Sequence, residues 1–281
     1  MASPTVAFLK RLFRRKLVLA AACVLLVFIL AALFAPWVAP YDPGALRVIR
    51  RLKPPSELNW LGTDEFGRDV LSRIVYGARA SLGIGAAVVA ISIAAGSAIG
   101  LTAGYFRRLD PPIMRMVDAV MALPDILLAI FLVAILGSSI FNVVFALAIV
   151  YTPRVVRVVR ASALVVREQQ FVEAARAIGA STPRILFRHI LMNVTSPVLV
   201  QATFIFAYAV LAEAGLSFLG AGVPPEVPTW GEMIASAQQY ADQAFWVVLF
   251  PGLAIVLAAL SLQVVGDGLR DQLDPKLRKA L

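Results

Sequence analysis

Long apolar runs alternate with short polar segments along most of this chain. A helix of about 20 mostly apolar residues crosses the hydrocarbon core of a bilayer, and its backbone satisfies its own hydrogen bonds there. The pattern predicts six such spans, at residues 17–39, 82–105, 116–136, 139–158, 196–218 and 245–265. The fourth has the loosest boundary, because Pro153 and Arg154 interrupt it. We therefore expect an all-α integral membrane protein.

The segments between the spans suggest three parts: residues 1–39, an external loop at 40–81, and a five-span core at 82–281. The loop is too long for a simple connector. Beyond Arg68, apolar residues recur at helical spacing and predict an amphipathic helix that leads into the second span. That helix would lie against the membrane or contact an external partner.

Composition agrees with a membrane protein. Hydrophobic residues make up 60% of the chain and charged residues 15%, whereas a soluble domain is roughly 45–50% apolar. The net charge of +9 comes from basic residues that flank the apolar runs. Such a distribution favours anionic lipid headgroups over nucleic acid as the counter-charge.

Basic residues also indicate the orientation, because those that flank spans remain on the cytoplasmic side. Most of the 26 lie in the terminal segments and in the second and fourth connections, which predicts that both termini are cytoplasmic. The first external loop opposes the rule, with Arg47, Arg50, Arg51, Lys53, Arg68, Arg73 and Arg79. The first apolar run exceeds the length of a cleaved signal core, so we expect an uncleaved anchor. The single cysteine, Cys23, excludes an intramolecular disulfide.

One polar, Arg-rich segment, residues 173–195, separates the fourth and fifth spans. Good helix formers lead to Gly179, which predicts a helix end, and Thr182 and Pro183 predict the start of a second helix that ends at Asn193. Small residues leave the elbow between the helices bare, and Glu173 adds one carboxylate. The segment is either a docking surface for another protein or an amphipathic hairpin on the lipid surface.

Polar residues within spans are candidates for a solute pathway, because their burial in lipid is costly. Gln201 and Tyr208 share one face of the fifth span, and Glu213 is rotated from it. Packing between helices explains Gln201 and Tyr208 about as well as contact with a solute does, and for Glu213 we favour a hydrogen bond between helices. We place Asp125 near the cytoplasmic interface. Gly96, Gly100 and Gly104 predict close approach of a neighbouring helix.

The elbow segment resembles the EAA loop of ABC-importer permeases at Glu173, Ala174, Ala175, Gly179 and Leu191, although Met192 stands where that family usually has proline. Three further blocks, which begin WLGTDEFGRD, AGYFRRLDPP and LAEAGLSFLG, resemble the second permease of the dipeptide and oligopeptide branch. Together the blocks cover most of residues 60–235.

The resemblance implies a type I importer permease with six spans, whose cytoplasmic coupling loop at 160–195 joins the fourth and fifth. It implies ATPase coupling through Glu173, Ala174, Ala175, Gly179, Ala180 and Ser181. The expected partners are a related permease, two cytoplasmic ATPases that bind ATP and Mg²⁺, and an extracytoplasmic binding protein. The expected location is a bacterial inner membrane, and the expected solutes are dipeptides or oligopeptides.

The sequence itself contains no GxxxxGK[ST] phosphate loop, so energy from ATP would have to come through a partner. A membrane-embedded enzyme is one alternative, but neither HExxH nor GxSxG occurs, and the only histidine, His189, lacks neighbours at metal-binding spacing. A secondary transporter is another, although we detect no internal repeat.

Overall fold

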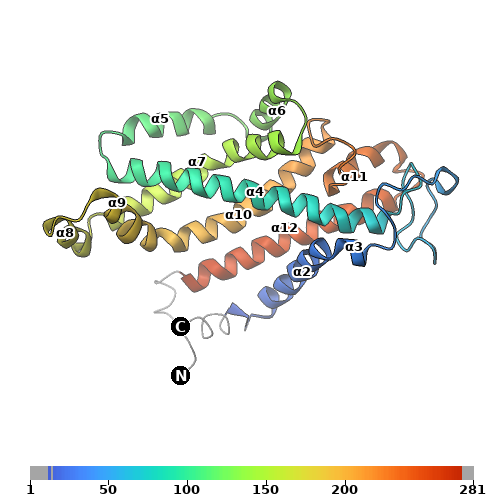
Figure 1. Ribbon diagram of the computed structural model, residues 1–281, viewed down its shortest axis with the longest axis horizontal. Coiled ribbons are helices and arrows are strands. Elements are labelled where there is room, and N and C mark those ends of the chain that lie inside the picture. Colours follow the sequence, from blue (N-terminus) through green and yellow to red (C-terminus); the bar gives the residue numbers. More distant parts are fainter. Residues whose placement is uncertain (1–11, 14, 274–281) are drawn as a thin grey trace.

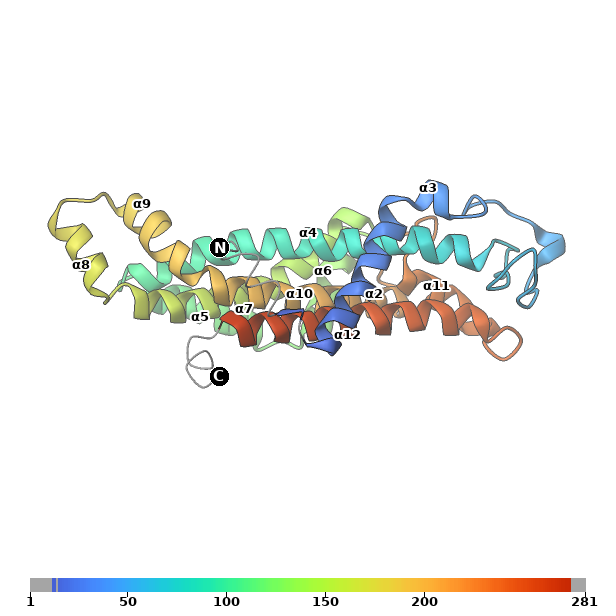
Figure 2. The same cartoon turned by 90° about the horizontal axis from the view of Figure 1, so that it is seen from below.

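The computed structural model describes residues 12–13 and 15–273, and in this part of the chain the regular structure is helical. Four long helices, α4 (Val70–Tyr105), α7 (Ile140–Val166), α10 (Met192–Phe218) and α12 (Trp246–Leu273), run along the long axis of an elongated molecule (Figure 1). Helix α2 (Lys16–Leu33) packs across α4 and α12 (Figure 2). Six of the nine terminal basic residues used to predict orientation lie outside the described residues: Lys10, Arg11, Arg14, Lys276, Arg278 and Lys279.

Five of the helices in the described residues are long and apolar enough to cross a membrane, and one bent pair would make a sixth span. The five correspond to the predicted first, second, fourth, fifth and sixth spans. The first predicted span includes a second, short helix, α3 (Ala35–Val38), which begins with a proline in its first turn.

The third predicted span, residues 116–136, is not one continuous helix, so that prediction was wrong in form. Helices α5 (Asp110–Met121) and α6 (Asp125–Leu136) replace it and meet at 89°. Pro124 precedes α6 with an extended ψ of 129°. Because proline has no N–H to donate and its ring displaces the preceding turn, the helix breaks there while the apolar pattern continues.

Two helices are longer than the bilayer requires. Helix α4 has 36 residues and the helical segment Thr182–Phe218 has 37, so each extends roughly 55 Å against a hydrocarbon core of about 30 Å. The amphipathic helix predicted after Arg68 is therefore the first part of α4, capped by Asp69, whose carboxylate accepts from the Ser72 N–H. The helix predicted to end at Asn193 continues without a break into α10, contrary to expectation.

The predicted glycine face of α4 packs directly on α7. A Cβ at Gly100 would lie 2.8 Å from both the Val156 carbonyl oxygen and the Val159 Cβ, and Gly96 and Gly104 approach α7 as closely. Only glycine permits this separation, so the prediction of close helix packing is confirmed.

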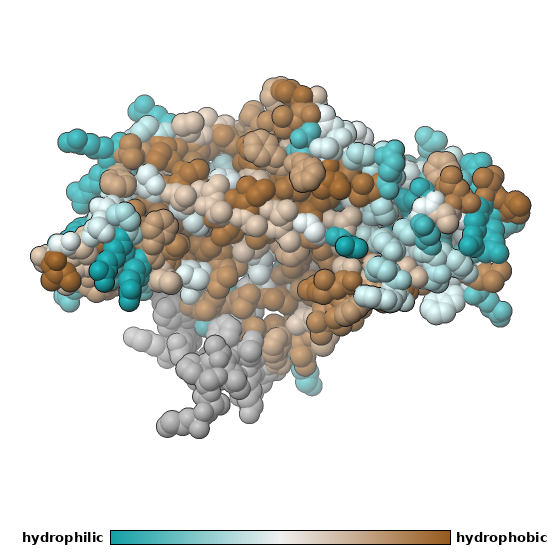
Figure 3. Space-filling view, in the orientation of Figure 1, coloured by the Kyte–Doolittle hydropathy of each residue, from teal (hydrophilic) through white to brown (hydrophobic). Residues whose placement is uncertain are grey.

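The surface has an apolar middle and polar ends (Figure 3). Large apolar side chains are exposed on the spans, among them Leu26, Val27, Phe131, Ile135, Leu257 and Leu260. Exposed apolar surface of this extent is unfavourable in water but suits a lipid environment.

Residues 40–69, which we call the outer segment after the predicted topology, fold against one end of α4 and α12, at the end of the molecule opposite the elbow (Figure 1). This outer segment contains one short helix, η1 (Val48–Arg50). The Trp246 indole donates to the Thr63 carbonyl oxygen at 3.2 Å, and the Arg47 N–H donates to that of Phe66 at 3.1 Å. Position 81, where the predicted external loop ends, falls inside α4, so the outer segment and the spans share a helix.

A buried ionic cluster joins this segment to α11 (Trp230–Ala237), which the turn η3 (Gln238–Tyr240) follows. Arg73 of α4 donates to Glu232 of α11 at 2.7 Å, and the cluster continues through Asp64, Glu65 and Arg68. Burial raises the pKa of Glu232 to about 7 although Arg73 opposes the shift. Three carboxylates face two guanidinium groups here, so a proton on Glu232 balances the charge.

Candidate functional site

The elbow predicted from residues 173–195 stands at one end of the molecule, beyond the spans (Figure 1). It consists of α8 (Gln170–Ala177), a sharp turn, the single turn α9 (Thr182–Arg184) and a π-helical segment, η2 (Ile185–Leu191), which continues into α10. The N-cap of α9 is Ser181 and not Thr182 as predicted, and its hydroxyl makes no capping bond.

The turn after α8 is built around Gly179, as its place in the sequence predicts. Gly179 adopts a left-handed φ of +77°. Its N–H donates to the Arg176 carbonyl oxygen, and the Ala180 N–H donates to that of Ala175, both at 3.0 Å. This pair of bonds is a Schellman motif, which ends the helix and satisfies carbonyl groups that would otherwise be unpaired.

Helix α8 has two distinct faces. Val172 and Ala175 are buried in the hydrophobic core, whereas Glu173 and Ala174 are exposed. Among the other predicted coupling residues, Gly179 and Ser181 are exposed and Ala180 is half-buried. Ala175 therefore holds α8 in place and does not itself offer a docking surface.

The structure adds an apolar contact point that the sequence analysis missed. Ile178 ends α8 with 84% of its surface exposed, beside Glu173 and Gly179 on the elbow. A large apolar side chain at the tip of a polar helix is the signal that could have identified it, because water disfavours such exposure.

Two arginines join the elbow and the end of α7 to the end of α4: Arg176 of α8, and Arg167, which is the C-cap of α7. The Arg176 guanidinium lies 5.2 Å from the centre of the Tyr105 ring. Arg167 donates to the Gly104 carbonyl oxygen at 2.6 Å and to Glu168 at 2.9 Å. The hydrogen bond from Arg167 lowers the pKa of Glu168, so this carboxylate stays ionised.

The predicted pathway residues lie in three different surroundings, and their role stays a prediction. Gln201 lines a cleft of about 490 Å³ with Val158 of α7 and Arg270 of α12. Tyr208, with 40% of its surface exposed, accepts a hydrogen bond on its carbonyl oxygen from the Tyr151 hydroxyl at 3.3 Å.

Glu213 is completely buried. Its Oε1 accepts hydrogen bonds from Ser217 at 2.9 Å and from Thr229, which caps α11, at 2.8 Å. Its Oε2 has no partner among the described residues. In this conformation the carboxylate joins α10 to α11 and is closed to any solute.

The sequence analysis did not anticipate a row of ion pairs between the bent pair α5–α6 and α7. Asp110 pairs with Arg160, Asp118 with Arg157 and Asp125 with Arg154. Three arginines at intervals of three along one helix are the signal that could have predicted it, because such residues share a face. Arg154, the partner of Asp125, is roughly 20 Å from either end of α7, and the position of Asp125 relative to the cytoplasmic interface stays a prediction.

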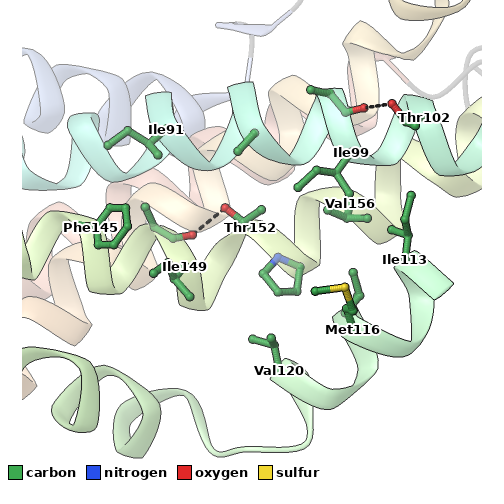
Figure 4. Close-up of a pocket in the computed structure, with 15 residues that line it drawn as sticks. Ile91, Ile99, Thr102, Ile113, Met116, Val120, Phe145, Ile149, Thr152 and Val156 are labelled. Atoms are coloured by element: carbon green, nitrogen blue, oxygen red, sulfur yellow. Dashed lines mark hydrogen bonds between the residues drawn. The ribbon is translucent and has the colours of Figure 1, made fainter. Parts of the chain in front are cut away.

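A larger cavity, of about 650 Å³, lies between α4, α5 and α7 (Figure 4). Its lining is apolar except for Thr102 and Thr152, whose hydroxyls donate to carbonyl groups of their own helices at 2.8 and 2.7 Å. Because no free polar group faces the cavity, it offers nothing that could replace the hydration of a charged solute.

The fold is that of a multi-spanning membrane permease. Residues 79–279 match the family described as binding-protein-dependent transport system inner membrane component, and residues 3–55 match the N-terminal TM domain of oligopeptide transport permease C. The chain belongs to the family of binding-protein-dependent transport system inner membrane components.

Several relatives are similar over nearly the whole chain. A putative peptide transport system permease protein of Brucella suis is 49% identical over 98% of this chain and 93% of its own length. The di/tripeptide transport system permease protein DppC of Pseudomonas aeruginosa is 49% identical over 91% of this chain and 87% of its own. The dipeptide transport system permease protein DppC of Escherichia coli is 45% identical over the same shares.

Among solved structures, a chain of the MetNI methionine ABC transporter in an inward-facing conformation is similar, with a TM-score of 0.60. The likeness covers 72% of this chain and 97% of that one at 18% identity, so it concerns the fold alone.

Proposed function

We propose that this chain is the membrane permease subunit of an ATP-driven importer of dipeptides or oligopeptides and forms half of its translocation pathway. Family membership and the peptide-transport names of relatives at 45–49% identity support the solute class. The observation that carries the coupling role is the projecting elbow, whose exposed face is free to bind a partner while its buried face is anchored to the spans.

The remaining half of the pathway would come from a related permease. Two ATPase subunits or domains would bind ATP and Mg²⁺ and hydrolyse the nucleotide, because this chain has no phosphate loop. The expected membrane is the bacterial inner membrane, and the elbow and both termini would face the cytoplasm. An extracytoplasmic binding protein would then meet the outer segment, which exposes apolar and basic side chains together, among them Val48, Ile49, Trp60 and Arg47.

Coupling follows from differential binding. An ATPase dimer that closes on ATP would hold α8 in one position better than in another, and only that difference in affinity can shift the spans between conformations. Tyr105 and Gly104, which contact arginines of the elbow, are the first residues of α4 to receive the displacement.

Substitution of Glu173 tests this function. We expect Glu173→Arg to abolish peptide uptake or release the ATPase, because it reverses the exposed charge on α8 without disturbing a buried contact. Peptide uptake by cells and co-purification of the ATPase measure the two effects. Glu226→Arg, at an exposed carboxylate of the outer loop, is the matched control and should leave both unchanged.

Normal uptake and normal assembly in Glu173→Arg would contradict the proposed coupling. A secondary transporter would instead show uptake driven by an ion gradient in this chain alone, without any co-purified ATPase. A membrane-embedded enzyme would likewise purify without one.

A further inference from the structure

The ion pair between Asp125 and Arg154 differs from its two neighbours in its surroundings. The Arg154 guanidinium lies 5.3 Å from the centre of the Tyr151 ring and 5.1 Å from that of Tyr208. The cluster therefore joins α6, α7 and α10. Tyr208 was already a candidate for the pathway, and the structure places a positive charge beside it.

These charges lie within the membrane-spanning part of α7, yet they are not sealed off. The side chains of Arg154 and Asp125 are 31% and 42% exposed, and Tyr208 is 40% exposed. A charged pair at this depth is costly unless it faces a bundle interior or a water-filled cavity. The exposure shows that the rest of this chain leaves one side of the cluster uncovered.

The pair also has unused bonding capacity. Among the described residues, Arg154 donates to Asp125 through Nη2 and has no other hydrogen-bonded partner. A guanidinium carries five donors and a carboxylate accepts several bonds, so both groups can bind a further ion. A carboxylate matches the guanidinium fork best.

The backbone supports the same assignment. Asp125 is the first residue of α6, directly after the 89° break from α5. The backbone N–H groups at the start of a helix carry partial positive charge, and in transporters such helix starts bind anionic groups of the solute, so the start of α6 favours a carboxylate. The cavity between α4, α5 and α7 has no charged side chain in its lining, so the Asp125–Arg154 cluster is better suited to bind the charged groups of a solute.

We propose that Arg154, Asp125 and Tyr208 form a contact site for the charged ends of a short peptide on its way through the membrane. Arg154 receives the terminal carboxylate, Asp125 receives the terminal ammonium group, and Tyr208 borders the space. This inference rests on the proposed function, because it assumes a peptide as the solute.

Exchange of partners gives the site a physical advantage. When a zwitterionic peptide binds, each protein charge gives up its protein partner and gains one on the peptide, so no charge is left unpaired in the membrane. Departure of the peptide restores the original pair. The site therefore compensates desolvation in both states and binds weakly enough to release the solute, as a pathway requires.

A cysteine probe tests the site on the purified complex of permeases and ATPases, without the binding protein. The chain carries Tyr208→Cys in a Cys23→Ser background, and the rate of labelling by N-ethylmaleimide is measured with and without dialanine. We expect dialanine to slow labelling by about threefold or more. This protection is reached once the dialanine concentration exceeds twice its Kd for the site. Dialanine amide, which lacks the carboxylate, should protect much less.

Arg154→Gln in this background should remove the protection. Arg157→Gln is the matched control, because Arg157 forms an equivalent pair with Asp118 one turn away but has no tyrosine beside it in the described residues. Protection should persist there. A purely structural role would affect labelling alike in both variants and would not distinguish dialanine from its amide.

Equal labelling rates with and without dialanine, or equal protection in Arg154→Gln and Arg157→Gln, would overturn the inference. Uptake of labelled dialanine by cells with the unaltered chain tests the proposed function separately. If cells accumulate dialanine but dialanine does not protect the cysteine from labelling, only the proposed contact site is wrong. If cells accumulate no peptide, the proposed function is contradicted.

Discussion

Single residues at the elbow decide how the chain changes direction outside the membrane. Gly179 matters for its backbone, since its φ of +77° is a conformation that costs other residues about 1–2 kcal/mol. No atom lies within 4 Å of a Cβ placed there, so the cost of a substitution is conformational and not steric. The orientation of Glu173 relative to α9 depends on this turn.

Gly179→Ala should therefore weaken ATP-driven uptake more than it lowers the amount of folded protein. Gly220 provides the control, because it has a φ of +78°, open space around it and the same Schellman bonds at the outer end of α10. Uptake divided by membrane abundance, measured for both variants, separates coupling from stability. Equal losses in Gly179→Ala and Gly220→Ala would argue against a special role for the elbow.

At the scale of the elements, α4 and α7 form the central contact of the fold. Their separation is fixed by glycine, since side chains of α7 occupy the space that a Cβ of Gly100 would need. Both helices also hold the elbow at their inner ends, through Tyr105, Gly104 and Arg167. Under the proposed function, this close packing would carry a displacement of α8 to the spans.

Gly100→Val should separate α4 from α7 and destabilise the protein, by about 1–3 kcal/mol or more for overpacking at a close contact. Gly83→Val is the control on the same helix, because a Cβ at Gly83 meets no atom within 4 Å. The thermal unfolding temperature of each purified variant measures the difference. Similar temperatures for the two variants would mean that this contact tolerates expansion.

The whole molecule has two chemically different ends separated by an apolar belt. One end is the elbow with its arginines, and the other is the compact outer segment with the ionic cluster of Arg73 and Glu232 (Figure 1, Figure 3). Seven basic residues between Arg47 and Arg79 oppose the positive-inside rule at the outer end. Two of them, Arg68 and Arg73, are neutralised within the cluster, which reduces the exposed charge there.

Cysteine labelling should show that the two ends face opposite sides of the membrane. In a Cys23→Ser background, Ile49→Cys places a thiol at a side chain that is 95% exposed on the outer segment, and Ser181→Cys places one on the elbow. An impermeant maleimide added to intact cells with a permeabilised outer envelope should label only Ile49→Cys. Disruption of the membrane should expose Ser181→Cys, and labelling of that thiol in intact cells would reverse the proposed topology.

Much of the architecture was readable from local pattern. The lengths of the apolar runs predicted five spans as single helices, because a span in lipid must form its backbone hydrogen bonds within its own segment. Gly179 ends α8 as predicted, because a helix end of this kind requires only one residue with a left-handed backbone conformation. The glycine face of α4 likewise indicated its packing.

The sequence predictions failed where they concerned the continuity of helices and the contacts of individual side chains. The bend follows from Pro124, whose effect on helix continuity an average hydropathy does not report. The uninterrupted course of residues 182–218 depends on packing that hydropathy does not report either. The inward face of Ala175 and the exposure of Ile178 follow from how α8 rests on the core.

The sequence by itself determined that the chain belongs in a membrane, where five of its spans lie and where the elbow lies, because these properties are set by runs of neighbouring residues. Only the tertiary structure decided that Asp125, Arg154 and Tyr208 meet, and that Glu213 is enclosed. Side chains from three helices come together only when the helices pack, because the distance between residues along the chain does not report their distance in space.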